Sequence, residues 1–425
     1  MPKNKKTETS EENESANPDL NEKELRPELN IGMVGHVDHR KTTLLEAISG
    51  VWTDTHSEEI KRGITIRLGY ANAVFYKEGS IYTTKPNDKL KAEALRKVSF
   101  VDAPGHESLM ATMLSGATII DGALLLVAAN EKCPQPQTRE HLMALQIIGI
   151  KNIVIVQNKI DLVDEKGALE NYRQIKDFVK GTAYENAPIV PISAQHKAGM
   201  SALIKTIEET IPTPKRERDK EPIMLVARSF DINRPGILPK ELKGGVIGGG
   251  MKQGILKIGQ EIEIRPGRTV VEKNKEVFKP IFTKIVDLNY GGVSVREISP
   301  GGTAGILTSL DPSIVKSDQL TGSIVGLPGK LPPVFYEITI MPHLLERAVG
   351  TENELNVDPI KISEALMLNV NSAATVGIVI SLKKNNILCK LRTPICADIK
   401  SRVTISRKIG NRFRLIGYGE IQESK

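Results

Sequence analysis

The sequence predicts an α/β domain with a doubly wound, mostly parallel sheet, followed by two antiparallel β-barrel domains. Between residues 30 and 211, apolar runs typical of buried strands alternate with stretches of helical periodicity. A lysine-containing loop, GHVDHRKTT at 35–43, follows the first of these strands. Beyond residue 220, glycines and short β-rich runs such as 244–267 replace the helical stretches, which is typical of small antiparallel barrels.

The strands of the first domain are expected where apolar residues run without interruption. Such runs are 98–101, 122–129 and 152–156, and the first strand is expected over 30–34. Helices are expected over 137–148 and 168–179. Because strands and helices alternate along the chain, this part is predicted to form one doubly wound α/β domain.

The domain boundaries follow from changes in composition. Residues 1–29 are almost wholly polar and cannot bury enough surface to offset the entropy of ordering, so they are predicted to be a disordered tail. The charged, proline-bearing run 212–220 is typical of a linker. The predicted domains are therefore 30–214 for the α/β domain, 215–331 for the first barrel and 332–425 for the second barrel.

The composition excludes several classes of protein. No apolar run reaches the roughly 20 residues of a membrane span, and the polar start has no secretory signal. Three cysteines, Cys133, Cys389 and Cys396, are too few and too scattered for a disulfide framework. We expect a cytoplasmic protein with neither a membrane nor DNA among its partners. The net charge of +7 is compatible with a polyanionic partner but does not require one.

The loop at 35–43 differs at one position from the phosphate-binding pattern G-x-x-x-x-G-K-[ST], because Arg40 replaces the second glycine. Lys41 is expected to reach the β- and γ-phosphates and the Thr42 hydroxyl to bind Mg²⁺. If position 40 needs a positive φ, a non-glycine residue costs about 1–2 kcal/mol. The arginine side chain would crowd the phosphates or Thr65, point outward, or contact a phosphate oxygen. We therefore expect a bound nucleotide with altered affinity or rate.

Three further motifs close apolar strands: Asp102-Ala103-Pro104-Gly105, Asn158-Lys159-Ile160-Asp161 and Ser193-Ala194-Gln195. Asp102 can hold magnesium, and Gly105 can turn a peptide N–H toward a γ-phosphate. Asp161 can accept both the ring N–H and the exocyclic amine of guanine, whereas adenine would leave the carboxylate unpaired at a cost of about 1–3 kcal/mol or more. The Ala194 N–H would reach the guanine oxygen. Each motif alone is often a turn, but all four in order predict a guanine-nucleotide site.

Together these motifs resemble the translational GTPases related to elongation factor Tu. The matching segments are GHVDHxKTT, KRGITI at 61–66, DAPGHE at 102–107 and PQTREH at 136–141. Longer stretches are most similar to the gamma-subunit family of archaeal and eukaryotic translation initiation factor 2, among them WTDTHSEEIKRGITIRLGYA, LMATMLSGATIIDGALLLVAANE, RSFDINRPG, LKGGVIGGG and HLLERAVG. The resemblance covers about residues 30–422 and implies a P-loop G domain followed by two β-barrels.

The resemblance also implies roles for residues near the phosphates. Thr65 matches the switch threonine that closes on Mg²⁺ when the γ-phosphate is present. Asp38 and the Gly63 backbone match positions near a second magnesium. His106 matches the residue that positions the attacking water, a task that needs orientation more than a strong base. The alternative for His106 is an ordinary solvent-facing histidine in a loop.

The predicted site has three sets of residues and uses GTP, GDP and Mg²⁺. The catalytic set is His106 with an apolar gate formed by Val37 and Ile64. The nucleotide set is Asp38, His39, Arg40, Lys41, Thr42, Thr43, Gly105, Asn158, Lys159, Asp161, Ser193, Ala194 and Gln195. The metal set is Thr42, Thr65, Asp38, Gly63 and Asp102. No zinc is expected, because residues 71–98 contain no cysteine for the zinc knuckle of many archaeal relatives, and 77–97 are expected to form a surface insertion.

The resemblance implies that the partners are methionyl initiator tRNA, the alpha and beta subunits of the same factor, and the small ribosomal subunit. The aminoacyl end of the tRNA would lie between the G domain and the first barrel. Residues 389–414 carry eight Lys and Arg against a single acid, Asp398. Such a stretch is either a phosphate-binding patch or a solvated barrel face.

Three functions remain open from the sequence. The first is a GTP-dependent carrier of initiator tRNA that hydrolyses GTP on start-site selection, which the segments SFDINRPG and KGGVIGGG favour. The second is an elongation-type GTPase for aminoacyl-tRNA. The third is a hydrolysis-deficient scaffold for the alpha and beta subunits, with Arg40 blocking turnover.

Overall fold

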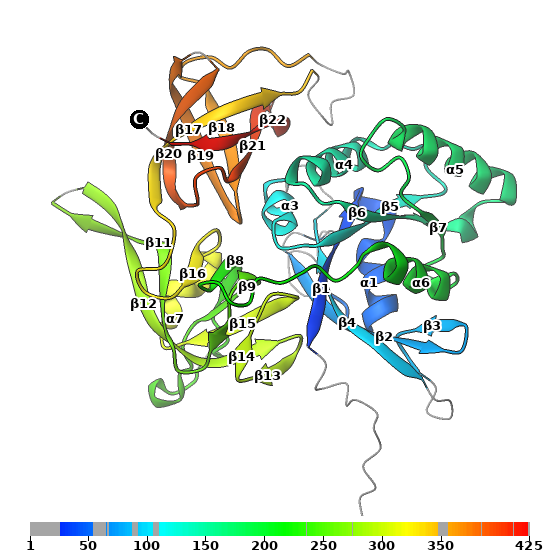
Figure 1. The fold of residues 1–425 in the computed structure, drawn as a ribbon, viewed down its shortest axis with the longest axis horizontal. Helices are drawn as coiled ribbons and strands as arrows, with labels where there is room; N and C mark the ends of the chain where they lie inside the picture. The colour runs from blue at the N-terminus through cyan, green and yellow to red at the C-terminus, as the bar shows by residue number, and fades with distance from the viewer. Residues whose placement is uncertain are drawn as a thin grey trace, which may run out of the picture.

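The chain forms an α/β domain on one side and two β-barrels on the other (Figure 1), which confirms the predicted fold class. The computed structural model describes residues 26–53, 65, 68–86, 92–104, 110–234, 236–273, 275–346, 356–383, 385–410 and 412–423. Within this part of the chain, no helix combines the length and apolarity required to cross a membrane.

A seven-stranded mixed sheet in the order β3-β2-β4-β1-β5-β6-β7 forms the centre of the α/β domain. Its strands are β1 (Pro27–Gly35), β2 (Gly69–Glu78), β3 (Ile81–Thr83), β4 (Glu93–Asp102), β5 (Gly122–Ala128), β6 (Asn152–Asn158) and β7 (Ile189–Pro191). β4, β1, β5, β6 and β7 are parallel, whereas β2 and β3 are antiparallel at one edge. The carboxyl ends of the parallel strands therefore bring their following loops together.

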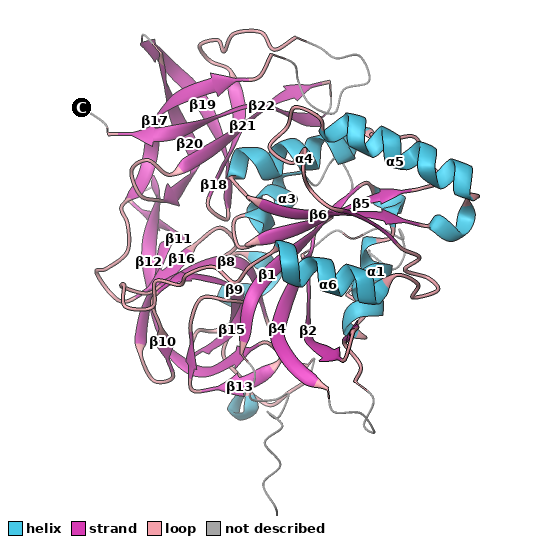
Figure 2. Cartoon of the chain, turned by 45° about the vertical axis from the view of Figure 1, so that its right-hand side comes forward, coloured by secondary structure: helices cyan, strands magenta, loops and turns pink. Residues whose placement is uncertain are grey.

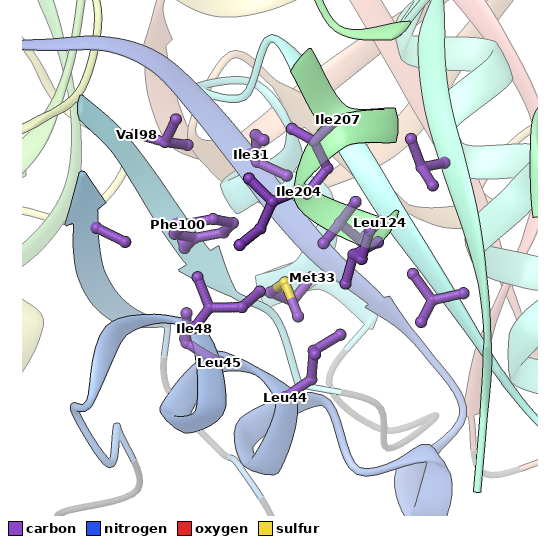
Figure 3. Packing of buried hydrophobic residues seen from close by; sticks show 14 of the residues in the cluster. Ile31, Met33, Leu44, Leu45, Ile48, Val98, Phe100, Leu124, Ile204 and Ile207 are labelled. Atoms are coloured by element: carbon purple, nitrogen blue, oxygen red, sulfur yellow. The ribbon is translucent and has the colours of Figure 1, made fainter. Parts of the chain in front are cut away.

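Helices cover both faces of this sheet (Figure 2). They are α1 (Lys41–Ser49), α3 (Met110–Ala117), α4 (Pro136–Ile148), α5 (Glu165–Val179) and α6 (Met200–Thr210). α1 and α6 bury Leu44, Ile48 and Ile207 against one face (Figure 3). α3, α4 and α5 cover the opposite face, where Leu145 and Ile175 join the second core. This burial of apolar side chains on both faces fixes where the strand-end loops lie.

The first barrel closes through β11-β16-β8-β9-β15-β12, with β12 pairing back to β11 and β13 added at its edge. Its elements are β8 (Ile223–Phe230), β9 (Val246–Gln253), β10 (Leu256–Lys257), β11 (Glu261–Glu272), β12 (Lys275–Tyr290), β13 (Val293–Val295), β14 (Glu297–Ile298), β15 (Thr303–Thr308), α7 (Pro312–Val315) and β16 (Ile324–Gly326). Its core is apolar and includes Ile247, Ile264 and Ile306.

The second barrel closes in the order β17-β20-β19-β18-β21-β22. Its strands are β17 (Val334–Leu344), β18 (Ala365–Val370), β19 (Ala373–Lys383), β20 (Asn386–Cys396), β21 (Arg402–Ile409) and β22 (Arg412–Gln422). Alternate residues point into the barrel, as in β19, where Val379 is fully buried and its neighbours Ile378 and Ile380 are exposed. The boundaries of the three domains near residues 214 and 331 remain predictions.

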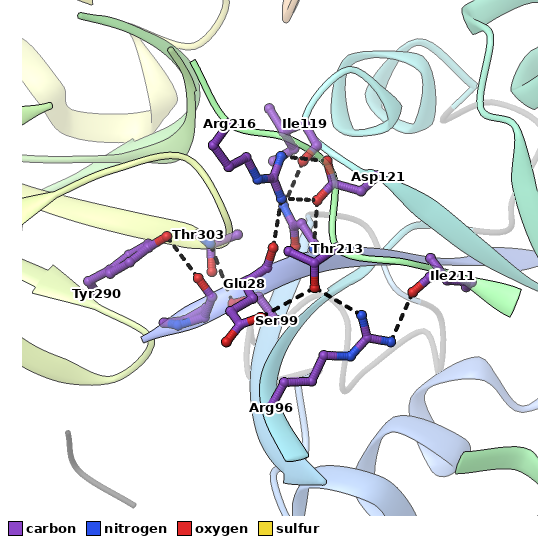
Figure 4. A network of polar contacts seen from close by, with 12 residues as sticks. Glu28, Arg96, Ser99, Ile119, Asp121, Ile211, Thr213, Arg216, Tyr290 and Thr303 are labelled. Atoms are coloured by element: carbon purple, nitrogen blue, oxygen red, sulfur yellow. Dashed lines mark hydrogen bonds and ion pairs between the residues drawn. The ribbon is translucent and has the colours of Figure 1, made fainter. Parts of the chain in front are cut away.

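Polar contacts join the α/β domain to the linker and the first barrel (Figure 4). Arg216 of the linker donates to both carboxylate oxygens of Asp121, at 2.9 and 2.7 Å, and to the Glu28 carbonyl at 2.8 Å. The Tyr290 hydroxyl of the barrel donates to the Pro27 carbonyl at 3.1 Å. The start of β1 is therefore held by both the linker and the barrel.

The first strand begins earlier than the sequence predicts. β1 begins at Pro27, whereas order was expected from residue 30. Tertiary contacts explain the earlier start of the strand. Leu29 is fully buried, and the Pro27 carbonyl accepts a hydrogen bond from Tyr290 of the barrel. Residues 1–25 of the predicted tail lie outside the described residues.

The described part of segment 77–97 belongs to the sheet and is not a surface insertion. It supplies the end of β2, all of β3 and the first half of β4. Arg96 is buried there, and its guanidinium donates to Glu208 at 2.7 Å and to the Ile211 carbonyl at 2.9 Å. The insertion was expected because the segment lacks the cysteines of the family's zinc knuckle. In the structure, the ion pair with Glu208 compensates the buried charge of Arg96.

Candidate functional site

The predicted phosphate-binding loop begins at Gly35, where a side chain has no room. Gly35 has φ +138°, and a Cβ there would lie 2.5 Å from the Leu126 carbonyl oxygen of β5. The chain then makes a short 3-10 turn over Val37–His39 and enters α1 at Lys41. The helix N-terminus therefore opens at the carboxyl edge of the sheet, where its free N–H groups attract phosphate.

Lys41 is enclosed by its own loop. Its Nζ donates to the Gly35 carbonyl at 3.1 Å and to the His36 carbonyl at 2.8 Å. Only 4% of the residue is exposed. The ammonium is thus held at the centre of the loop, where an incoming phosphate would meet a positioned charge.

Three of the predicted magnesium ligands lie together. The Thr42 hydroxyl donates to Asp102 Oδ2 at 2.7 Å, and Thr65 Oγ1 lies 3.3 Å from Thr42 Oγ1. Thr53, which the sequence analysis did not identify, donates to the same Asp102 oxygen at 3.0 Å. Asp102 is fully buried. A buried carboxylate among hydroxyls fits Mg²⁺, which prefers hard oxygen ligands.

Asn158 connects three of the predicted motifs. Its Nδ2 donates to the His39 carbonyl of the phosphate loop at 3.0 Å. Its Oδ1 accepts from the Lys159 N–H at 2.8 Å and from the Ala194 N–H at 3.0 Å. The residue is 1% exposed, so these bonds are shielded from water. A guanine oxygen would therefore share the Ala194 N–H with Asn158.

Asp161 is an accessible acid of the site, with 25% of its side chain exposed. A hydrogen bond from the Ser193 hydroxyl is the main cause that lowers its pKa, and the charges of His196 and Arg40 act in the same direction. His196 Nε2 lies 3.7 Å from Asp161 Oδ2. The carboxylate is therefore ionised and oriented from one side, as an acceptor for two guanine N–H groups needs to be.

Glu131 follows β5 and links two predicted nucleotide residues. His39 is fully buried; its Nδ1 lies 2.7 Å from the Leu126 carbonyl and its Nε2 3.4 Å from Glu131. Lys159 Nζ lies 3.6 Å from the other Glu131 oxygen. The hydrogen bond with His39 is the main cause that lowers the pKa of Glu131. Sequence reasoning missed this acid, although it ends the segment VAANE in the resemblance.

His141 of α4 supports the start of the phosphate loop. Its Nδ1 accepts the Gly35 N–H at 2.8 Å, and the side chain is almost fully buried. Burial, followed by the charge of Lys41, lowers the pKa of His141 to about 3. The ring is therefore neutral and acts as an acceptor. The sequence signal for His141 was its place in the family motif PQTREH, from which only the family resemblance was inferred.

Arg40 provides the left-handed backbone that the pattern normally assigns to glycine. Its φ is 59° and its ψ 48°. The side chain is exposed, and its Nη1 donates to Gln195 Oε1 at 2.5 Å. The guanidinium thus extends to the loop after β7. Of the placements considered from the sequence, this exposed contact corresponds to a side chain that points outward.

The other predicted site residues are less connected or lie outside the description. Asp38 is exposed in the 3-10 turn, while Val37 and Thr43 are half-buried. Four predicted site residues lie outside the described residues: Gly63, Ile64, Gly105 and His106.

The basic stretch 389–414 is not one continuous solvent-facing patch. Arg414 is buried and pairs with Glu140 of α4 at 2.8 Å. Arg402 donates to the Ile147 carbonyl at the end of α4, and Arg407 pairs with Glu364 within the barrel. Three of the eight basic residues therefore serve contacts inside the molecule, and two of them hold the second barrel against the α/β domain.

Two family models match this chain. The elongation factor Tu GTP binding domain matches residues 26–213, and the C-terminal domain of initiation factor eIF2 gamma matches residues 336–421. The first match covers the sheet and every loop described above. The chain is therefore a translational GTPase, an enzyme that binds guanine nucleotide and hydrolyses GTP.

A curated relative specifies the family. Translation initiation factor 2 subunit gamma from Methanocaldococcus jannaschii is 60% identical over 400 residues, covering 93% of this chain and 97% of the relative. This chain belongs to the translation initiation factor 2 gamma-subunit family and is a GTPase of translation initiation.

Solved structures share the fold at lower identity. Elongation factor SelB from Methanococcus maripaludis, in complex with the GTP analogue GPPNHP, is 23% identical with a TM-score of 0.69, covering 94% of this chain and 80% of that chain. A bacterial selenocysteine-specific elongation factor, EF-Sec, has the same identity and TM-score; the match covers 92% of this chain but spans only 58% of that chain. These likenesses show the three-domain fold alone.

Proposed function

We propose that this chain carries methionyl initiator tRNA to the small ribosomal subunit in a GTP-dependent manner and hydrolyses GTP to GDP on start-site selection. The observation that carries the proposal is the 60% identity along 97% of a translation initiation factor 2 gamma subunit. The relative is named as a subunit, which supports assembly with alpha and beta subunits of the same factor in the cytoplasm.

Nucleotide binding is divided between two groups of residues in this proposal. Asp161 pairs with the guanine, with Ser193, Ala194 and Gln195 beside it in the base loop. At the other end Lys41 contacts the phosphates. The compact placement of these residues at one edge of the sheet supports this division.

The magnesium site is proposed at Thr42, Thr65 and Asp102, whose oxygens already cluster. Asp38 and the Gly63 backbone are proposed near a second ion. Magnesium, when bound, neutralises the charge that develops on the β- and γ-phosphates. The protein residues would hold and orient the ion. Asp102 supplies the buried carboxylate, and the hydroxyls of Thr42 and Thr65 lie beside it.

For hydrolysis, His106 is proposed to orient the attacking water, with Val37 and Ile64 gating its access. This part rests on the motif DAPGHE and the family resemblance. His106→Ala should slow single-turnover GTP hydrolysis at least tenfold while leaving the GDP dissociation constant within about twofold. His343→Ala, which changes an exposed histidine of β17 in the second barrel, is the matched control and should leave the hydrolysis rate unchanged. A normal rate in His106→Ala would remove His106 from catalysis.

Filter binding tests the tRNA proposal. The full chain, assembled with alpha and beta subunits and loaded with GTP, is titrated against methionylated initiator tRNA and methionylated elongator tRNA. We expect at least tenfold tighter binding of the initiator, weakened when GDP replaces GTP. Because both tRNAs carry methionine, the comparison isolates the tRNA body. Equal binding of the two would favour the elongation-type alternative.

A further inference from the structure

Arg40 and Gln195 join the two ends of the nucleotide site. Arg40 precedes α1 in the phosphate loop, whereas Gln195 lies in the loop after β7, 155 positions later. Their side chains meet at 2.5 Å, with the guanidinium donating to the amide oxygen. Both residues are exposed, so this contact lies at the mouth of the site rather than in its core.

The backbone explains why the side chain of Arg40 can leave the loop. Residue 40 is left-handed with φ 59°, and its carbonyl accepts the first helical N–H, from Leu44, at 3.1 Å. Glycine would satisfy the same backbone. What arginine adds is a planar cation with five donors, of which Gln195 engages one in the described structure.

The charge of Arg40 also acts on Asp161, the acid proposed to recognise the base. Arg40 is among the groups that lower the pKa of Asp161, after the hydrogen bond from Ser193. The hydrogen bond to Gln195 places the guanidinium on the side of the phosphate loop that faces the base loop. Lys41, by contrast, directs its ammonium inward to the Gly35 and His36 carbonyls. Two adjacent cations thus serve different parts of the site.

We propose that Arg40 and Gln195 form a strap that connects the phosphate loop to the base loop and slows release of a bound guanosine di- or triphosphate. This inference rests on the guanine-nucleotide site described above. A nucleotide that touches both loops leaves fastest when the loops separate, and the strap opposes that separation. The positive charge of the guanidinium would also attract the phosphates of a bound nucleotide, which adds to the same effect.

The test is the rate of release of fluorescent GDP, chased with excess unlabelled GDP in a stopped-flow instrument. Arg40→Gly should release GDP about tenfold faster, equivalent to about 1.4 kcal/mol. Gln195→Ala should reproduce most of this increase. The double variant should release GDP no faster than Arg40→Gly, because both changes remove the same strap. Arg40→Lys, which keeps the charge but lacks the planar fork, should lie between wild type and Arg40→Gly.

The opposite result would overturn the strap. If Arg40→Gly binds GDP faster and releases it no faster than wild type, the side chain obstructs the site. If neither wild type nor Arg40→Gly holds GDP at all, the nucleotide function itself fails. If both hold GDP with the same release rate, only the strap fails.

Relief of backbone strain needs its own control. Lys400 in the second barrel is exposed and also left-handed, with φ 66°. Arg40→Gly and Lys400→Gly should each raise the melting temperature of the nucleotide-free protein by about 2–4 °C. Only Arg40→Gly should change GDP release. A faster release in Lys400→Gly as well would assign the effect to general stability and would overturn the strap.

Discussion

The phosphate end and the base end of the nucleotide site hold their polar groups in different ways. At the phosphate end two charged groups are buried: Lys41 is enclosed by loop carbonyls, and Asp102 accepts hydrogen bonds from the hydroxyls of Thr42 and Thr53. At the base end the charged group, Asp161, is partly exposed, and the buried group is the neutral amide of Asn158.

Because of this difference, binding should rearrange protein contacts at the phosphate end, whereas the base end is arranged before the nucleotide binds. A phosphate and a metal entering the first end must replace protein contacts that Lys41 and Thr42 already make. A base entering the second end meets a carboxylate that is ionised and oriented in advance. Changes at exposed Asp161 should therefore alter nucleotide choice with little effect on stability. Changes at buried groups should alter stability together with binding.

The largest expected effect comes from Asp161→Asn. An amide donates where the carboxylate accepted, so it opposes the guanine N–H groups and suits the carbonyl of xanthine. We expect GTP affinity to fall by roughly a thousandfold. Affinity for xanthosine triphosphate should rise by a similar factor. Competition of both nucleotides against fluorescent GDP or its xanthine counterpart measures the two affinities.

The melting temperature of nucleotide-free Asp161→Asn sharpens the comparison. It should stay within about 2 °C of wild type, because the side chain is partly exposed. A large drop in melting temperature would show that the base end is as structural as the phosphate end. Unchanged guanine preference would contradict the role assigned to Asp161.

The next effect comes from Asn158→Ala, which removes three hydrogen bonds shielded from water. At about 0.5–1.5 kcal/mol for each bond, the free energy of unfolding should fall by about 1.5–4.5 kcal/mol. Release of GDP should accelerate too, because the phosphate loop and the base loop lose their common partner. Urea unfolding of the nucleotide-free chain gives the first value, and the displacement of fluorescent GDP gives the second.

Asn233 in the first barrel is the matched control. Its amide contacts Asp231 and both polar atoms of the Lys243 backbone, but the residue lies at the surface. Asn233→Ala should cost less than about 1 kcal/mol, because water replaces the lost partners. Equal costs at the two positions would mean that burial does not strengthen the Asn158 bonds.

The features that the sequence predicted share one physical basis. Loops that follow parallel strands must meet at one sheet edge, so Lys41, Asp102 and Asp161 could be placed together from strand order alone. The contacts that it did not predict depend on tertiary packing. His141 meets Gly35 across 106 positions, and no local pattern marks it as an acceptor. The direction of the Arg40 side chain likewise depended on a left-handed backbone and a distant loop.

The smallest expected effect is the contribution of His141, at the buried phosphate end, to the pH dependence of stability. His141 is neutral in the native state because burial and the charge of Lys41 lower its pKa to about 3. In the unfolded chain its pKa is about 6.5. Between these values the unfolded state binds a proton that the native state does not, so stability falls as the pH falls below about 6.5. From pH 7.5 to 5.5 this group should lower the free energy of unfolding by about 1.4 kcal/mol.

His141→Asn isolates this contribution, because its amide oxygen can accept the Gly35 N–H but does not titrate. The variant should lose about 1.4 kcal/mol less than wild type between pH 7.5 and 5.5 in urea unfolding of the nucleotide-free chain. Burial also lowers the pKa of His36, but that residue is present in both proteins and cancels in the difference. Parallel curves of unfolding free energy against pH for the two proteins would show that the imidazole of His141 can be protonated without opening the phosphate loop. The contrast between a buried phosphate end and an accessible base end would then not extend to α4.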